Sequence, residues 1–238
     1  QHAVLGAQVF AHRPLQPGHG AQFRHPVRIR QAARIEYEID VARHAPLERE
    51  RLEHEMGDLA RRVARWAGVA DKTVIDPCAG DGELIAAALE AGAARAIAYE
   101  LDDRLVGILC ERFAEDERVQ VFQCDFLDSM VSFGVPAVAL LNPPYENNGE
   151  ATFVKRCFEI ECQTVTSITR TSALHGGARW KILKDYPILR GARTIYRPSF
   201  SGETTGGRFD TLITQRVRAG AGGNGLEAWE DWDEKWTD

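Results

Sequence analysis

The sequence predicts an α/β fold: a doubly wound, mostly parallel sheet with helices on both faces and an antiparallel C-terminal hairpin. From Thr73 onward, short apolar runs alternate with segments of helical period, which is the pattern of strands joined by crossover helices. Two later strand-like runs flank a loop rich in glycine, serine and threonine, which suits a hairpin at a sheet edge. The chain of 238 residues has room for one large domain with short appendages, since a domain takes roughly 150 residues.

A long amphipathic helix is expected before the alternating region. Pro46 opens it, because proline suits the first helical turn, and Gly68 follows its last apolar residue. The apolar residues that recur near the helical period are Leu52, Met56, Leu59, Val63 and Trp66. Strands are then predicted over residues 73–75, 96–99, 119–122, 138–141, 164–169, 193–196 and 211–217, and helices over 83–91, 103–113 and 150–160.

The predicted domain lies between two segments of different composition. Residues 1–45 have many histidines and prolines and predict an irregular basic arm, with a strand near residues 34–39; residues 46–220 form the domain. Residues 221–238 form an acidic tail rich in tryptophan. Its tryptophans, Trp229, Trp232 and Trp236, are spaced by three and four, so a helix would place them on one face. Docking of that helix on the domain and binding of a protein partner both remain open.

The net charge of -6 is unevenly distributed. Residues 151–220 contain 12 Lys or Arg against 5 Asp or Glu, whereas residues 46–150 contain 10 against 21. A basic region of +7 within an acidic protein predicts a surface for a polyanion such as DNA or RNA, although ordinary solvated surface charge is the alternative.

Other classes of protein are disfavoured by the composition. No apolar run approaches the roughly 18 residues of a membrane span, and the first residues do not resemble a secretion signal, so we expect a cytoplasmic protein with no membrane contact. The five cysteines form no CxxC pair, and the histidines lack short metal-ligand spacing, so we expect reduced thiols and no metal site.

A glycine-rich turn follows the first predicted strand of the sheet. The segment from Asp76 to Gly82 reads Asp-Pro-Cys-Ala-Gly-Asp-Gly, and such a turn lets a ligand approach the backbone at the carboxyl end of a sheet. The NAD pattern would need glycine or alanine where Ile85 stands, and Asp76 and Asp81 would repel a pyrophosphate. Acidic residues suit a cationic or zwitterionic ligand instead, and Glu100 at the end of the next strand could accept hydrogen bonds from ribose hydroxyls. S-adenosylmethionine (SAM) has these properties.

Two further positions fit the same ligand. Asp125 follows the third strand and could accept a hydrogen bond from an adenine amino group, while Phe126 could flank the ring. Either residue alone is a weak signal, and their order behind the glycine loop strengthens it.

The fourth strand runs into Asn142, Pro143, Pro144 and Tyr145. The Asn142 amide oxygen and the Pro143 carbonyl, held stiffly by the prolines, could together bind one NH2 group, and Tyr145 could stack on a planar substrate. Two acceptors would favour a pyramidal nitrogen whose lone pair points at a sulfonium methyl group. Such catalysis rests on positioning and electrostatics and requires neither a metal nor a strong base.

Together, the Asp76–Gly82 and Asn142–Tyr145 segments resemble the cofactor and catalytic motifs of SAM-dependent amino-methyltransferases that modify adenine N6, cytosine N4 or protein glutamine. The resemblance implies the Rossmann-like fold of that family and catalytic roles for Asn142, Pro143, Pro144 and Tyr145. The cofactor-binding residues that it implies are Asp76, Cys78, Ala79, Gly80, Gly82, Glu100, Asp125 and Phe126.

Downstream, residues 147–158, then Arg170-Thr171-Ser172 and then residues 196–200 are similar to segments of small phage-type DNA adenine methyltransferases. This resemblance implies roles near the target base or the nucleic-acid backbone for Arg197 and Phe200, although a structural arginine and a core phenylalanine fit equally well. We therefore expect an N6-adenine methyltransferase that acts on DNA or RNA with a flipped-out base. His44-Ala45-Pro46 stands where many adenine enzymes have Thr-Pro, which is a departure from the family pattern. The lack of room for a recognition domain predicts short or lax recognition of the target sequence. A protein glutamine N5-methyltransferase and a non-catalytic subunit that binds nucleic acid or a partner remain alternatives.

Overall fold

The computed structural model describes residues 8–10, 46–129, 137–145, 149–194, 210–220 and 228–232. The elements, in chain order, are β1 (Gln8–Phe10), α2 (Pro46–Ala67), β2 (Thr73–Asp76), α3 (Glu83–Glu90), β3 (Arg95–Glu100), α4 (Asp103–Arg112), β4 (Val119–Gln123), η1 (Phe126–Asp128), β5 (Ala137–Leu141), α5 (Gly149–Glu159), β6 (Cys162–Arg170), η3 (Thr171–Leu174), α6 (Gly177–Leu183), β7 (Ile188–Thr194), β8 (Thr211–Arg216) and β9 (Ala228–Trp232).

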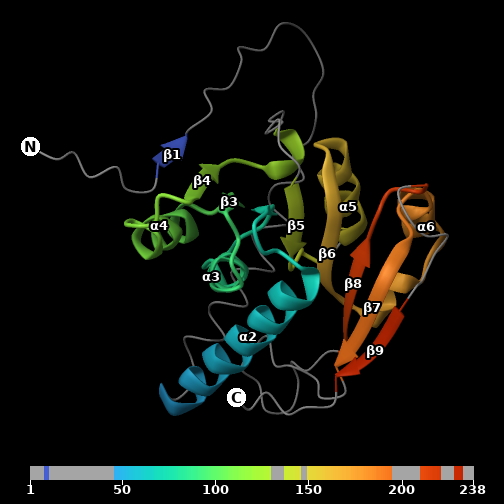
Figure 1. Cartoon of the computed structure of the whole chain (residues 1–238), viewed down its shortest axis with the longest axis horizontal. Coiled ribbons are helices and arrows are strands. Elements are labelled where there is room, and N and C mark those ends of the chain that lie inside the picture. Colours follow the sequence, from blue (N-terminus) through green and yellow to red (C-terminus); the bar gives the residue numbers. More distant parts are fainter. Residues whose placement is uncertain are drawn as a thin grey trace, which may run out of the picture.

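The strands form one sheet in the order β1-β4-β3-β2-β5-β6-β8-β7-β9 (Figure 1). Neighbouring strands in this order are parallel from β1 as far as β6, and β8 runs antiparallel to both β6 and β7. The predicted fold class is therefore confirmed, with β7 and β8 as the antiparallel hairpin. From β2 the chain continues to β3 on one side and later returns to β5 on the other, so the topological switch point lies between β2 and β5.

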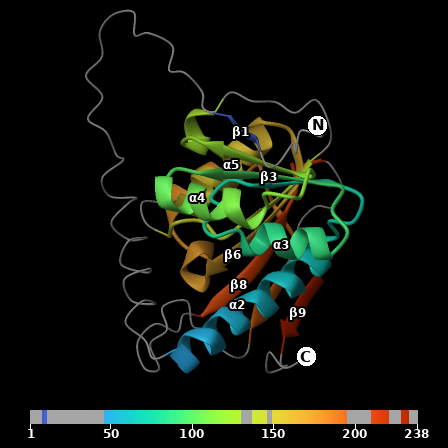
Figure 2. The ribbon, with the colours of Figure 1, turned by 90° about the vertical axis from the view of Figure 1, so that its left-hand side faces the viewer.

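Helices cover both faces of the sheet, as Figure 2 shows: α5 lies on one side, and α2, α3 and α4 lie on the other. The alternation of side chains along β2 builds both cores, since neighbouring residues of a strand point to opposite faces. Val74 packs in the cluster that contains Leu59 of α2, whereas Ile75 packs in the cluster that contains Phe158 of α5. In the described part of the chain, no helix is long and apolar enough to cross a membrane.

The tryptophan-rich tail contains a strand where a helix would have aligned its tryptophans. Residues 228–232 form β9, which pairs in parallel with β7 and leaves Trp232 only 2% exposed. Trp232 meets Trp66 edge to face at a centroid distance of 5.9 Å, and both indole nitrogens donate to the Glu230 carboxylate. The helical expectation for these residues is wrong because the backbone groups at the β7 edge find partners in another strand. Trp236 and the side chain of Trp229 lie outside the described residues.

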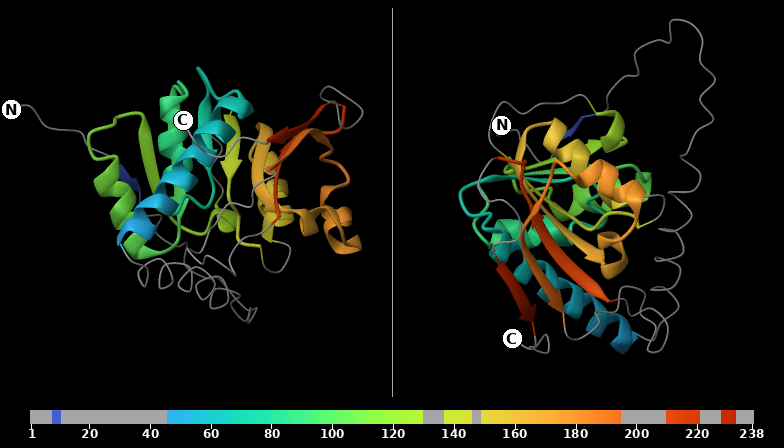
Figure 3. Two further views of the ribbon diagram at one scale, coloured as in Figure 1. Left: turned by 90° about the horizontal axis from the view of Figure 1, so that it is seen from below. Right: turned by 90° about the vertical axis from the view of Figure 1, so that its right-hand side faces the viewer.

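Two other elements depart from the expectation. β1 falls within the predicted irregular arm and pairs with β4, while the rest of residues 1–45, including the strand expected near 34–39, lies outside the described residues. The short helix α6 was not expected, and β7 begins at Ile188, earlier than the predicted start at residue 193. Figure 3 shows from two further sides how the last strands extend the sheet beyond β6.

Candidate active site

The predicted site residues lie along one edge of the sheet. Parallel strands end at the same edge, and the sheet order β4-β3-β2-β5 places Asp125, Glu100, Asp76 and Asn142 side by side in that order. The glycine loop after β2 and the segment after β5 flank the switch point, where ligands bind in open α/β sheets.

The glycine loop is held by backbone hydrogen bonds and by buried carboxylates, the first of which is Asp76. Asp76 is 2% exposed, and its Oδ1 accepts a hydrogen bond from the Cys78 amide at 3.0 Å. The Ala79 amide donates to the Tyr99 carbonyl of β3 at 2.9 Å. Gly80 has a φ of 63°, in the left-handed region that favours glycine. These contacts give the loop a defined path between β2 and α3.

Gly82 has a packing role in addition to its place in the loop. Its φ is 91°, and a Cβ added to it would lie 2.6 Å from Phe113 Cε2 and 2.8 Å from Leu109 Cδ2. The start of α3 can therefore approach α4 only with glycine at this position.

Glu100 organises the glycine loop through hydrogen bonds to backbone amides. Its Oε2 accepts from the Gly80 amide at 2.8 Å, and its Oε1 accepts from the Leu101 and Asp102 amides at 2.8 and 3.1 Å. The carboxylate is buried, and charge-assisted bonds to backbone amides offset the cost of burying it. A carboxylate oxygen has more than one acceptor position, so contact with a ribose hydroxyl is compatible with the bond to Gly80.

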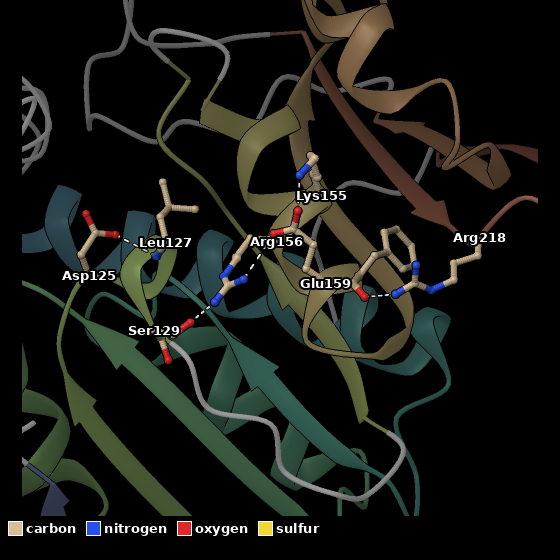
Figure 4. Close-up of polar contacts among 8 residues, drawn as sticks. Asp125, Leu127, Ser129, Lys155, Arg156, Glu159 and Arg218 are labelled. Carbon is tan, nitrogen blue, oxygen red and sulfur yellow. Dashed lines mark hydrogen bonds and ion pairs between the residues drawn. The ribbon is translucent and has the colours of Figure 1, made fainter.

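Asp125 is the N-cap of the short helix η1, and its Oδ1 accepts from the Leu127 amide at 2.9 Å (Figure 4). Figure 4 also shows Arg156 of α5 reaching the Ser129 carbonyl just beyond η1, so α5 braces this corner.

Phe126 does not flank the ligand side of this corner. It is 2% exposed, and its ring meets Tyr99 edge to face at 5.0 Å and stacks on Phe153 at 5.9 Å. The expectation that its ring contacts adenine is corrected: burial of a large apolar surface places the ring in the core.

The segment after β5 is tied to the glycine loop. Cys78 Sγ lies 3.4 Å from the Asn142 carbonyl oxygen, and the Tyr145 hydroxyl donates to Asn142 Oδ1 at 2.7 Å. Tyr145 therefore orients the amide whose oxygen is the predicted acceptor. The guanidinium of Arg170 at the end of β6 lies 4.6 Å from the centre of the Tyr145 ring, so one face of the ring stacks on a cation.

Sequence reasoning missed Arg170 and Gly149 as parts of this site. A Cβ added to Gly149, the first residue of α5, would lie 2.1 Å from the Pro144 carbonyl oxygen. The helix thus begins in contact with the motif, and the only sequence signal is a glycine at the predicted helix start shortly after two prolines. Arg197 and Phe200 lie outside the described residues.

Cysteine thiols and metal ligands are the other groups that could form a functional site. Cys78, Cys157 and Cys162 are buried and form no disulfide, and burial raises the pKa of Cys157 well above its ordinary value. Among the residues that the structure describes, no group of three or more His, Cys, Asp and Glu side chains could hold a metal ion.

No family model matches the sequence, and no curated protein matches it. Solved structures do match. A candidate RNA methyltransferase from Pyrococcus horikoshii is 23% identical with a TM-score of 0.56, over 68% of this chain and 83% of that chain. A candidate class I SAM-dependent methyltransferase from Listeria monocytogenes is 11% identical with a TM-score of 0.60, over 88% of this chain and 74% of that chain. The 23S rRNA methyltransferase ErmE is 18% identical with a TM-score of 0.53, over 68% of each chain. At these identities the likeness concerns the fold alone: the chain has the Rossmann-like fold of SAM-dependent methyltransferases.

Proposed function

We propose that this chain is a SAM-dependent N-methyltransferase that modifies adenine N6 in DNA or RNA. One observation carries the proposal: the acceptor pair of Asn142 and Pro143 lies at the switch point, directly beside the glycine loop. The contact of 3.4 Å between Cys78 Sγ and the Asn142 carbonyl oxygen joins the two segments. A cofactor on the loop and an amine on the acceptors would therefore be neighbours.

The residues at the loop fit SAM. Gly80 has a left-handed backbone and no Cβ, so a ligand can approach the loop closely at this residue. The buried carboxylates of Asp76 and Glu100 favour a cationic ligand over a phosphate. Asp76, Gly80, Glu100 and Asp125 would hold it. When bound, SAM would supply a methyl group on a sulfonium sulfur; the substrate nitrogen would take that methyl group, the C–S electron pair would stay with sulfur in the leaving thioether, and a nitrogen proton would pass to water.

The chain's own residues would bind and orient the amine. Asn142 Oδ1 can accept from the substrate NH2 while it accepts from the Tyr145 hydroxyl, because an amide oxygen has two acceptor positions. The Pro143 carbonyl supplies the second acceptor. Arg170 stacks on one face of Tyr145, and the substrate ring would stack on the opposite face. This arrangement lowers the barrier by positioning and electrostatics.

Nucleic acid is the substrate that the charge distribution favours. The region 151–220 carries a charge of +7, and it contains Arg170 next to the proposed catalytic tyrosine. A base within a duplex cannot reach a site at a sheet edge, so the target would be flipped out or single-stranded. Short or lax recognition of the surrounding sequence is part of this proposal.

Mass spectrometry of digested products tests the proposal. Purified protein and SAM are incubated separately with unmethylated DNA, transcribed RNA and a protein extract. We expect N6-methyladenine in a nucleic acid; methylglutamine alone would select the glutamine enzyme, and SAM binding without any product would favour the non-catalytic subunit. An Asn142→Ala control should lower kcat by about 30- to 1000-fold, the loss typical of a positioned hydrogen-bonding group. Full activity of that variant would refute the mechanism.

A further inference from the structure

A second concave site lies on the other side of β6 from the switch point. A pocket of about 340 Å³ opens between η3, α6 and the start of β7, with α6 beside α5 (Figure 1). We call it the α6 pocket; the lining residues that matter here are Leu174, Arg179, Trp180, Leu183, Lys184 and Arg216. Nothing in the proposed methyl-transfer chemistry uses it.

Arg216 of β8 places a buried positive charge in this pocket. It is 6% exposed, its Nη1 donates to the Tyr186 carbonyl at 2.9 Å, and its buried Nε has no hydrogen-bond partner. In the described part of the chain, no carboxylate forms an ion pair with it, and Glu150 acts on it only at longer range. Burial lowers the pKa of Arg216 because desolvation disfavours the cation. An anion in the pocket would offset the unpaired charge of the guanidinium.

Two further cations line the pocket. Arg179 Nη1 donates to the carbonyls of Ser172 and His175 at 3.2 and 3.3 Å, which fixes the guanidinium without neutralising it. Lys184, at the end of α6, is exposed. The neighbouring Asp185 does not line the pocket. Three cations around one cavity are the arrangement expected for a phosphate group.

The apolar part of the pocket is unusually exposed. Trp180 is 65% exposed and Leu174 is 45% exposed. An exposed indole between cationic side chains is the arrangement that single-stranded nucleic acid uses, because bases stack on aromatic rings while cations contact the backbone.

The chain path connects this pocket to the proposed active site. Arg170, which stacks on Tyr145, is followed directly by η3, whose Ala173 and Leu174 line the pocket. Three residues span at most about 11 Å, so the Cα atoms of Arg170 and Ala173 lie within that distance, and the Arg170 side chain covers the remaining distance to the Tyr145 ring.

We propose that the α6 pocket binds a nucleotide of the substrate strand next to the flipped base, with its phosphate at Arg216, Arg179 and Lys184 and its base on Trp180. The assignment rests on the proposed function and specifies how that function holds its polymer. A free nucleotide offers the same phosphate and base chemistry, so the test separates the two sources.

Fluorescence anisotropy with a labelled single-stranded oligonucleotide, without SAM, measures this binding. The double variant Arg179→Gln/Lys184→Gln should raise Kd about 10-fold or more and lower the slope of log Kd against log salt by up to about 0.7, since one phosphate contact of a single strand contributes about 0.7. Trp180→Ala should raise Kd about 5- to 100-fold with little change of slope, because stacking is not ionic.

Matched controls lie elsewhere on the surface. Lys72→Gln removes an exposed charge at the turn before β2, and Ile108→Ala removes an apolar side chain that is 46% exposed on α4. Both should leave Kd unchanged.

Each outcome bears on a separate statement. Wild-type binding that all pocket variants retain would overturn the pocket and leave the proposed function standing. Failure of the wild-type protein to bind DNA or RNA oligonucleotides would overturn the nucleic-acid substrate and the pocket with it. Competition by adenosine monophosphate or inorganic phosphate with the affinity of the oligonucleotide would show a free-nucleotide or free-phosphate site and overturn the strand assignment.

Discussion

Gly149 couples the start of α5 to the proposed catalytic segment, and Gly149→Ala tests that coupling. The added methyl group would lie 2.1 Å from the Pro144 carbonyl oxygen and 3.2 Å from the Pro144 carbonyl carbon. Ordinary contact begins at 3.4 Å, so the helix start and the Pro144 backbone must separate by about 1.3 Å. Neither atom belongs to a flexible side chain, and the movement therefore transfers to the backbone that carries Asn142 and Tyr145.

The expected loss follows from the sensitivity of catalysis to position. A displacement of about 1 Å in a positioning group can lower a rate by about 100-fold. We expect Gly149→Ala to lower kcat by about that factor while SAM affinity, measured by calorimetry, stays near the wild-type value, because the glycine loop is not displaced. Steady-state methyl transfer to the preferred acceptor gives kcat, and thermal unfolding shows whether the variant is folded.

Gly107→Ala is the matched control. Gly107 lies within α4, and nothing lies within 4 Å of the Cβ position. The change should leave kcat unaltered and stabilise the protein by about 0.5–1 kcal/mol through helix propensity. A folded Gly149→Ala variant with wild-type kcat would refute the claim that α5 positions the motif.

Three further predictions concern stability. Burial raises the pKa of Tyr99 to about 12, from 10.0 for an exposed tyrosine. The contribution of the protonated hydroxyl to the free energy of unfolding is therefore complete below pH 10 and is lost as the pH rises through 12. When the pH rises from 9 to 11, the unfolding free energy of the wild-type protein, measured by urea titration, should fall by about 1 kcal/mol more than that of Tyr99→Phe. Equal decreases in the two proteins would contradict the raised pKa of Tyr99. Gly82→Ala should cost about 2–4 kcal/mol, because its Cβ would lie 2.6 Å from Phe113 Cε2 in a left-handed backbone; an unchanged urea midpoint would exclude that packing. Trp232→Ala should cost about 3–5 kcal/mol, whereas no loss would show that β9 adds nothing to the fold.

The sequence determined the parts of the fold that depend on local periodicity and turn chemistry. Alternating apolar runs and helical segments predicted the strands β2 to β6 and the helices between them close to their observed bounds. Because parallel strands end at one edge, the order of Asp76, Glu100, Asp125 and Asn142 in the chain also predicted that they meet there.

Only the tertiary structure decided which partner each residue takes. The spacing of Trp229, Trp232 and Trp236 suited a helix, but the open backbone groups of β7 made a strand the better partner. Phe126 follows Asp125, a candidate ligand residue, in the chain, yet a core site between Tyr99 and Phe153 buries its ring. Packing in three dimensions, which a one-dimensional pattern does not encode, also decided three contacts of the sites. These are the contacts of Gly149 with Pro144, of Arg170 with Tyr145 and of Arg216 with the α6 pocket.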